Sequence, residues 1–191
     1  IQNRRSTVVP GAHSYEIARI AISLDGKMVV TADEHSEPQL RVWDTDQLLQ
    51  AEIHGNIEEE NQDQRPVKYL KIDPNSDQVL CIYLNGAVQI FEHGTGNVIR
   101  AMDRIYYLNK LAPDDCHIDV ISDLSYLAIA KSYHGCDDIC EIDLRTGECS
   151  IFTPSPEQLP LAGEFDVDGL WYSSGGNVLH VQIEGGPVIS W

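Results

Sequence analysis

The densest group of potential metal ligands in the chain is the stretch HGCDDIC at residues 134–140. It brings two thiols, one imidazole and two carboxylates close together in the sequence, from His134, Cys136, Asp137, Asp138 and Cys140. Zinc is bound by such side chains in tetrahedral sets, usually as two closely spaced pairs. A second pair would have to come from Cys116 and His117 or from Cys149. We therefore predict a Gly/Asp turn without metal, with a Cys136–Cys140 disulfide as the alternative in an oxidising compartment.

Acidic pairs are the other candidate chemistry, at Asp114-Asp115, Asp137-Asp138 and Asp166/Asp168. A glycosidase needs two carboxylates that face one cleft at a defined separation, and adjacency in the sequence does not provide that. The sequence lacks the nucleophile-elbow, phosphate-loop and zinc-protease motifs. We expect no catalytic residue and no cofactor, so the chain is predicted not to be an enzyme.

The most individual charged segment is EEENQD at 58–63, with carboxylates at Glu58, Glu59, Glu60 and Asp63. The chain has 30 acidic and 13 basic residues and a net charge of −17, which disfavours contact with nucleic acid and with anionic membranes. A basic partner would instead be attracted. A charge run of this kind usually indicates a solvated loop. The alternative is a docking site for a Lys/Arg-rich segment of a protein partner.

The five cysteines, an odd number, favour reduced thiols and an intracellular location, cytoplasmic or nuclear. No apolar run approaches the roughly 20 residues that span a bilayer. The opening IQNRRSTVVPGAH contains no signal-peptide core. Because the chain starts at Ile1 rather than at methionine, we expect it to be part of a longer protein.

The elements that would position these residues repeat along the chain. Four stretches share an apolar strand, a polar turn and a second apolar strand, at 17–32, 67–83, 117–132 and 163–174. Alignment on Ile22, Ile72, Ile121 and Phe165 gives intervals of 50, 49 and 44 residues. Short, alternating, β-branched segments predict strands, and the interval suits a four-stranded antiparallel sheet with its loops.

A further strand is predicted after each stretch: QLRVWD at 39–44, AVQIFE at 87–92, DICEIDL at 138–144 and NVLHVQI at 177–183. Two of these strands lead into glycine turns at the same offset, at Gly96 and Gly147. The segment TDQLLQAEIH at 45–54 fits either two helical turns or a turn and an outer strand. Helical periodicity is otherwise nearly absent, so the sequence predicts an all-β protein.

The stretch at 11–44 resembles one WD-repeat blade. It contains a Gly-His corner at 11–13, the turn SLDGK at 23–27, the strand end TAD at 31–33 and a closing Trp-Asp at 43–44. In that family a buried hydrogen-bonded chain links four side chains, which the resemblance assigns to His13, Thr31, Asp33 and Trp43. Such pairing offsets the cost of burying polar groups. Later units match less well, since Phe91-Glu92 stands where Trp-Asp would.

The resemblance implies a β-propeller or partial propeller of about four blades, each a four-stranded antiparallel sheet. We divide residues 1–191, a single domain or fragment, into blade-like units at about 11–50, 51–97, 98–148 and 149–191. STVV at 6–9 and PVISW at 187–191 are predicted to be outer strands.

The family implies a non-catalytic interaction scaffold or ligand-sensing domain within a larger protein or complex. One alternative is an enzymatic propeller, such as a hydrolase or lyase, whose carboxylates would converge in a cleft and show shifted pKa values. The other is a set of blades that completes a propeller with another chain.

Overall fold

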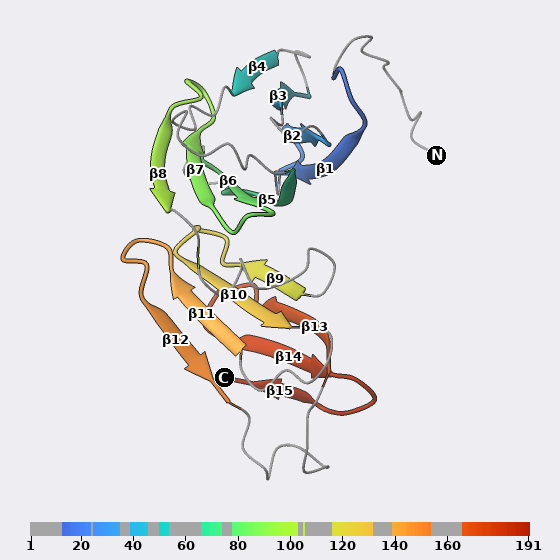
Figure 1. Ribbon diagram of the computed structural model, residues 1–191, viewed down its shortest axis with the longest axis vertical. Helices are drawn as coiled ribbons and strands as arrows, with labels where there is room; N and C mark the ends of the chain where they lie inside the picture. Colours follow the sequence, from blue (N-terminus) through green and yellow to red (C-terminus); the bar gives the residue numbers. More distant parts are fainter. Residues whose placement is uncertain are drawn as a thin grey trace.

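The computed structural model describes residues 13–23, 25–34, 39–45, 50–53, 66–73, 78–102, 105, 116–131, 139–153 and 166–191. Its strands form four antiparallel sheets, of which the first two occupy the upper half of the molecule and the last two the lower half (Figure 1). The prediction of an all-β chain with four such sheets is confirmed. The described part of the chain contains no helix with the length and apolarity needed to cross a membrane.

Within every sheet, strands that follow one another in the sequence are neighbours. The first sheet contains β1 (Ile17–Ile22), β2 (Met28–Asp33), β3 (Leu40–Asp44) and β4 (Gln50–Ile53). The second contains β5 (Val67–Asp73), β6 (Gln78–Tyr83), β7 (Val88–Glu92) and β8 (Val98–Met102). The third contains β9 (Cys116–Val120), β10 (Tyr126–Lys131), β11 (Ile139–Asp143) and β12 (Cys149–Phe152). The fourth contains β13 (Val167–Tyr172), β14 (Leu179–Ile183) and β15 (Val188–Ser190).

The order of strands differs from the sequence expectation mainly in the fourth sheet. The segment predicted at 177–183 supplies β14, the second strand of its sheet, whereas the other three segments of that group supply third strands. PVISW supplies β15, which pairs with β14 as a third strand instead of forming an outer fourth one. STVV at 6–9 lies outside the described residues.

The outer strands clarify where each repeat ends. Residues 50–53 form β4, an outer strand, so of the two alternatives for the segment at 45–54 the turn and outer strand is the correct one. Strand pairing places β8 in the second sheet, with β5–β7, and β12 in the third sheet, with β9–β11. The predicted unit boundaries at 97/98 and 148/149 instead assign β8 to the third unit and β12 to the fourth.

All four sheets share one register. In the first three sheets a row of paired residues crosses the first, second and third strands, as Ile22–Val29–Trp43, Ile72–Val79–Phe91 and Val120–Leu127–Ile142. The fourth row is Tyr172–Leu179–Trp191, in which Leu179 and Trp191 exchange both backbone hydrogen bonds at 3.0 Å. Ile22 and Ile72 are equivalent as predicted. Val120 takes the position assigned to Ile121, and Tyr172 takes that of Phe165.

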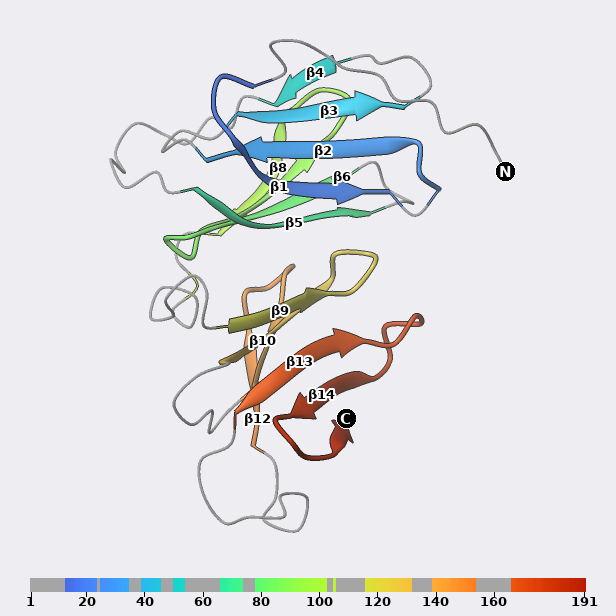
Figure 2. The same ribbon diagram turned by 90° about the vertical axis from the view of Figure 1, so that its right-hand side faces the viewer.

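Each sheet has two faces, and we call the face toward the preceding sheet the front and the face toward the following sheet the rear. Side chains alternate between the two faces along a strand, so one register fixes which residues pack together. Three apolar cores result, between the first and second, second and third, and third and fourth sheets. Figure 2 shows the two halves from the side, with the first and second sheets in one and the third and fourth in the other.

The two predicted glycine turns have the same geometry. Gly96 donates its backbone N–H to the Glu92 carbonyl at 2.8 Å, and Gly147 donates to Asp143 at 2.7 Å. Both glycines have positive φ, 72° and 78°, a region that costs other residues strain. This shared turn explains why the same Gly offset recurs after β7 and β11.

Candidate functional site

A hydrogen-bonded chain of side chains lies on the front face of the first sheet. His13 Nε2 lies 2.6 Å from the Thr31 hydroxyl oxygen, which accepts a 2.9 Å hydrogen bond from the Trp43 indole. His13 Nδ1 lies 3.4 Å from Asp33 Oδ2. The side chain of Asp33 is fully buried, and that of His13 is 2% exposed. The structure therefore brings together the four residues that the resemblance selected.

The donors and acceptors of this chain are consistent with one tautomer of His13. Because the Thr31 oxygen accepts from the indole, its own hydrogen can be donated to His13 Nε2. In that tautomer the Nδ1–H group is left for Asp33. Each of the four side chains in this hydrogen-bonded chain thus has a partner, and this pairing offsets the cost of burying their polar groups.

The same register position is apolar in the other sheets. Thr31 is equivalent to Cys81, Ile129 and Val181, each of which belongs to a core with the preceding sheet. Trp43 is equivalent to Phe91, which is fully buried. The first sheet thus uses a polar chain where the later sheets use apolar packing.

A pocket of about 200 Å³ lies beside Trp43, at the end of the first sheet where β1 turns into β2. It is lined by two acidic residues, Asp25 and Asp44, one basic residue, Lys27, the apolar Met28, and His93 from the turn after β7. A lysine or arginine side chain combines a cationic head with an aliphatic stem. The pocket has walls suited to both parts.

The turn after β1 fixes the Asp25 carboxylate. Asp25 Oδ1 accepts hydrogen bonds from the Ser23 hydroxyl at 2.7 Å and from the Lys27 amide at 3.0 Å. The Ser23 bond first, and then the Lys27 amide, lower the pKa of Asp25. Gly26 has φ of 71°, which this tight turn requires. Asp25 is therefore an ionised acceptor at neutral pH.

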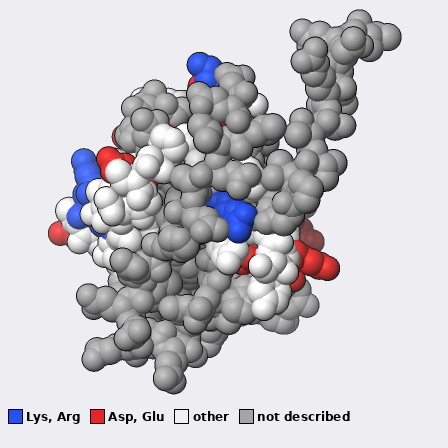
Figure 3. All heavy atoms as spheres, turned by 90° about the horizontal axis from the view of Figure 1, so that it is seen from above, with Lys and Arg blue, Asp and Glu red and all other residues white. Residues whose placement is uncertain are grey.

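Charge alone does not single out one patch near this pocket. Seen from the end that the first sheet occupies, the described charged side chains form several separate groups of both signs (Figure 3). Lys27 lies in the same turn, with its ammonium 4.0 Å from Asp25 Oδ2. The pocket is therefore a more specific feature than the surface charge around it.

A second polar cluster joins the first strands of neighbouring sheets. Asp119 on β9 accepts hydrogen bonds from Lys71 Nζ at 3.1 Å and from the Tyr69 hydroxyl at 3.3 Å, both on β5. Its other oxygen accepts the backbone N–H of Tyr172, on β13, at 2.8 Å. One carboxylate thus connects the second, third and fourth sheets.

The tyrosines of this cluster are held as donors. Tyr172 donates its hydroxyl to Glu141 Oε1 at 2.7 Å. Burial, followed by the neighbouring carboxylates Asp119 and Glu141, raises the pKa of Tyr69 and of Tyr172 above the ordinary value of 10. Both hydroxyls stay protonated, so the cluster holds the sheets together and is not poised to transfer protons.

No protein-family model matches the chain, and no curated protein matches its sequence. The WD-repeat resemblance therefore depends on the residues of the first sheet and stays an interpretation.

Two groups of predicted site residues lie outside the described residues. They are the acidic loop, with Glu58, Glu59, Glu60 and Asp63, and the possible ligands His134, Cys136, Asp137 and Asp138. Within the described ranges, no three His, Cys, Asp or Glu side chains are grouped so that they could hold a metal ion.

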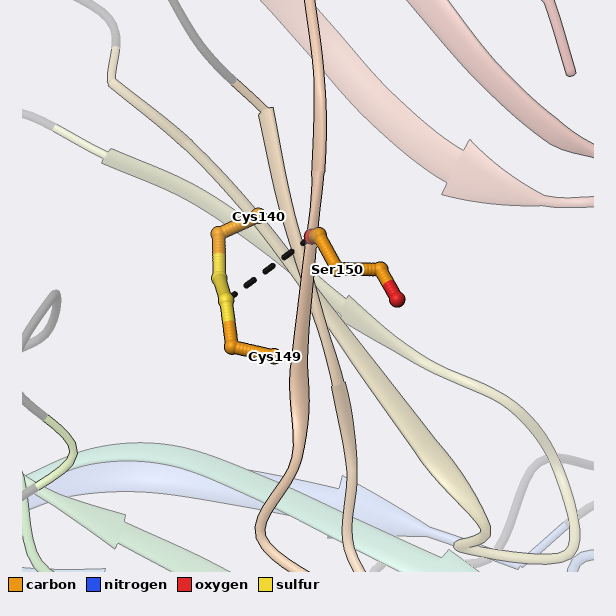
Figure 4. The surroundings of a disulfide bond; sticks show 3 residues. All are labelled: Cys140, Cys149 and Ser150. Atoms are coloured by element: carbon orange, nitrogen blue, oxygen red, sulfur yellow. Dashed lines mark hydrogen bonds between the residues drawn. A yellow bond between two sulfur atoms is a disulfide. The ribbon is translucent and has the colours of Figure 1, made fainter.

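The cysteine pairing corrects the sequence expectation. Cys140 forms a disulfide bond with Cys149 on the adjacent strand β12, so the alternative Cys136–Cys140 pair is wrong (Figure 4). The reason is the pairing of β11 with β12, which sets Ile142 opposite Cys149 and brings Cys140 diagonally next to it. The expectation of reduced thiols is also wrong for this pair, whereas Cys81 keeps its thiol, and the Cys116 sulfur accepts a 2.7 Å hydrogen bond from Lys68 Nζ.

Proposed function

We propose that the chain is a non-catalytic protein-interaction scaffold, built as a WD-repeat-like stack of sheets, that binds a basic segment of a partner protein. The observation that carries the proposal is the common register. Four sheets of one kind are held in one stack by three apolar cores, which gives the turns at the sheet ends fixed positions. Binding through loops on such a rigid support is a common use of repeat folds.

The pocket beside Trp43 is the part of the described surface that we assign to the partner. Asp25 and Asp44 supply negative charge there, and Met28 and Trp43 supply apolar contact. The acidic loop at 58–63 is proposed as a second contact for the same basic segment. The net charge of −17 favours a basic protein over nucleic acid or an anionic membrane as partner.

The pKa shifts of the described residues support a binding role over catalysis. A catalytic carboxylic acid needs a raised pKa to hold its proton near neutral pH. Asp25 and Asp143 have lowered pKa values, because each accepts hydrogen bonds within a turn. Burial raises the pKa of Cys81 to about 12, within the core between the first two sheets. These shifts follow from turns and cores.

The proposal is tested with a fluorescent Lys/Arg-rich peptide, whose binding to the full chain is followed by anisotropy at low and at physiological salt. We expect binding that weakens as salt increases, because exposed charges are screened. The Asp25→Asn/Asp44→Asn variant is expected to bind roughly 2- to 5-fold more weakly per lost ionic contact. A second variant replaces Glu58, Glu59 and Glu60 with Gln and Asp63 with Asn.

The matched control is Glu184→Gln, which removes an exposed carboxylate from the turn between β14 and β15 of the fourth sheet. It should leave the peptide affinity unchanged. The proposal fails if a Gly/Ser peptide of the same length binds equally well, or if neither the pocket variant nor the loop variant weakens binding.

A further inference from the structure

The first sheet exposes two isoleucines at positions that the next sheet buries. Ile20 is 60% exposed and Ile22 is 64% exposed, on the front face of β1. The register makes them equivalent to Leu70 and Ile72 on β5, which are 8% and 6% exposed because they pack against the first sheet. An aliphatic residue at each of these positions is therefore covered in the second sheet and open in the first.

The later sheets follow the second one. Val120 on β9 is equivalent to Ile22, and Leu170 on β13 is equivalent to Ile20; both are buried against the preceding sheet. The other two equivalents, Ile118 and Tyr172, are partly buried and pack on the same cores. In three of the four sheets this face is an interface. Continuity of the stack thus predicts an interface on the front of the first sheet as well, where Ile20 and Ile22 continue the apolar row.

The interfaces within the stack also show what kind of surface covers such a face. The rear of the first sheet presents Val30, Ala32, Leu40 and Val42, and the rear of the second presents Leu80, Ile82, Val88 and Ile90. All eight side chains are aliphatic and buried. The rear of the third sheet is also mainly apolar, with Ala128, Ala130 and Ile139, and it carries one carboxylate, Glu141, which accepts the Tyr172 hydroxyl. A matching partner surface is therefore an antiparallel sheet whose contacting face is mainly aliphatic.

The fourth sheet does not offer that surface. At the equivalent rear positions it carries His180, Gln182, Val188 and Ser190, three of which are polar. His180 is stacked on Trp171 and lies 2.8 Å from the Ser190 hydroxyl. The fourth sheet also lies in the opposite half of the molecule from the first (Figure 1). Packing of the fourth sheet on the first, within one chain or between copies, would bury polar groups against Ile20 and Ile22.

Symmetric pairing of two first sheets is disfavoured by charge. Each chain has a net charge of −17, so two copies repel one another over the range that salt leaves unscreened. A partner sheet with little negative charge avoids this repulsion. The occupant that fits the face is thus a different sheet of the same general kind.

We infer that the front face of the first sheet, centred on Ile20 and Ile22, is a docking face for one further antiparallel β-sheet with a mainly aliphatic contacting face. The inference rests on the proposed scaffold role and names a second contact of that scaffold. It does not depend on the basic segment bound at the turns.

The test supplies such a sheet. A second copy of residues 66–102, which carries the aliphatic rear face of the second sheet, is fused ahead of Ile1 of the full chain. We expect hydrogen exchange of the β1 amides to slow by about tenfold or more, because covering two isoleucines stabilises the strand locally. The matched control carries Leu80→Gln and Ile90→Gln in the added copy only, and it should not protect β1.

Dye binding to the unfused chain tests whether Ile20 and Ile22 form an accessible apolar face, even if the added copy does not fold. The apolar dye bis-ANS should bind the native chain, and the Ile20→Glu/Ile22→Glu variant should lose most of that binding. Ile99→Glu/Ile151→Glu, at two other exposed isoleucines on outer strands, should retain it. Unchanged dye binding in Ile20→Glu/Ile22→Glu overturns the inference, as does equal protection of β1 by the control copy.

Two further readouts separate the remaining outcomes. A dimer in sedimentation that Ile20→Glu/Ile22→Glu converts to monomer would assign the face to a second copy and overturn the inference. Binding of the Lys/Arg-rich peptide is measured on the same variant. If the chain binds the peptide but the added sheet does not protect β1, this inference alone has failed. The proposed function is tested separately, by the loss of peptide binding in the Asp25→Asn/Asp44→Asn variant.

Discussion

The front faces of the first and second sheets use equivalent positions in different ways. On the second sheet, Cys81 and Phe91 are fully buried against the first sheet. On the first sheet, Thr31 and Trp43 stand at those positions and hydrogen-bond each other, with His13 covering Thr31. A common register thus permits two solutions, an apolar interface and a polar chain within one sheet.

The comparison shows that the hydrogen-bonded chain covers only part of the front face of the first sheet. It covers the centre of β2, where Thr31 is buried, but it leaves Ile20 and Ile22 on β1 exposed. A sheet at the end of a stack cannot use a neighbour to bury its central positions, so hydrogen bonds within the sheet take that role. The exposed edge of the same face remains able to accept a neighbour.

The largest expected contrast between the two sheets is at the equivalent isoleucines. Ile72→Ala should lower the free energy of unfolding by about 2–5 kcal/mol, because it removes buried contacts and leaves a cavity. Ile22→Ala should change it by no more than about 0.5 kcal/mol, since that side chain is exposed. Urea denaturation of both variants measures the contrast. Equal losses would mean that Ile22 is covered in solution.

A smaller effect is expected at the centre of the polar chain. Thr31→Val keeps the shape but removes the hydroxyl, so the Trp43 indole and the His13 ring lose their shared partner. This should lower the free energy of unfolding by about 1–3 kcal/mol. Thr31→Ser retains the hydroxyl and should lose less, as measured by urea denaturation. A loss for Ser as large as that for Val would show that the methyl group, and not the hydrogen bonds, matters at this position.

The smallest effect on stability is expected at Asp143, which ends β11 in the third sheet and is equivalent to Asp44 at the end of β3 in the first. The Arg145 side chain and backbone lower the pKa of Asp143 from 3.8 to about 2. A lowered folded-state pKa contributes stability above the unfolded pKa, and this contribution is lost as pH falls from about 4 to about 2.

The measurement compares Asp143→Asn with the unsubstituted protein by urea denaturation at pH 7, 4, 3 and 2. Asp143→Asn should be slightly less stable at pH 7, and the difference should disappear as pH falls through that range. Arg145→Gln should give a smaller pH dependence of the same sign, because it removes the ion pair but keeps the backbone hydrogen bonds to Asp143. A difference that is unchanged at pH 2 would rule out this carboxylate as its cause.

Local patterns in the sequence predicted most of the first three sheets. Alternating apolar residues gave the strands, and the glycines at 96 and 147 gave their turns. The resemblance of 11–44 to one blade led to the four side chains of the polar chain, since each belongs to a short motif. These features depend on neighbours in the sequence, which is why they can be inferred without a structure.

The fourth sheet was misassigned because Asp168-Gly169 suggests a turn. The structure instead has a register shift between Val167 and Gly169 within β13, as it has between Ile17 and Arg19 in β1. A β-bulge and a turn favour the same residue types, so the sequence does not distinguish them. One misplaced turn moved the remaining strands of that sheet by one position.

The Cys140–Cys149 bond and the Asp119 cluster depend on pairing between strands that the sequence pattern leaves open. The disulfide follows from the register of β11 against β12. The partners of Asp119 lie 48, 50 and 53 residues away, on other sheets. These separations match the repeat interval, and a search for polar pairs at that spacing would have found them.

The position of Asp119 has a mechanical consequence. Its carboxylate accepts bonds from Lys71 in the sheet before it and from the Tyr172 amide in the sheet after it. A tilt of one neighbouring sheet therefore pulls on a carboxylate that the other neighbour also binds. Displacements at either end of these three sheets would be transmitted between their first strands through Asp119.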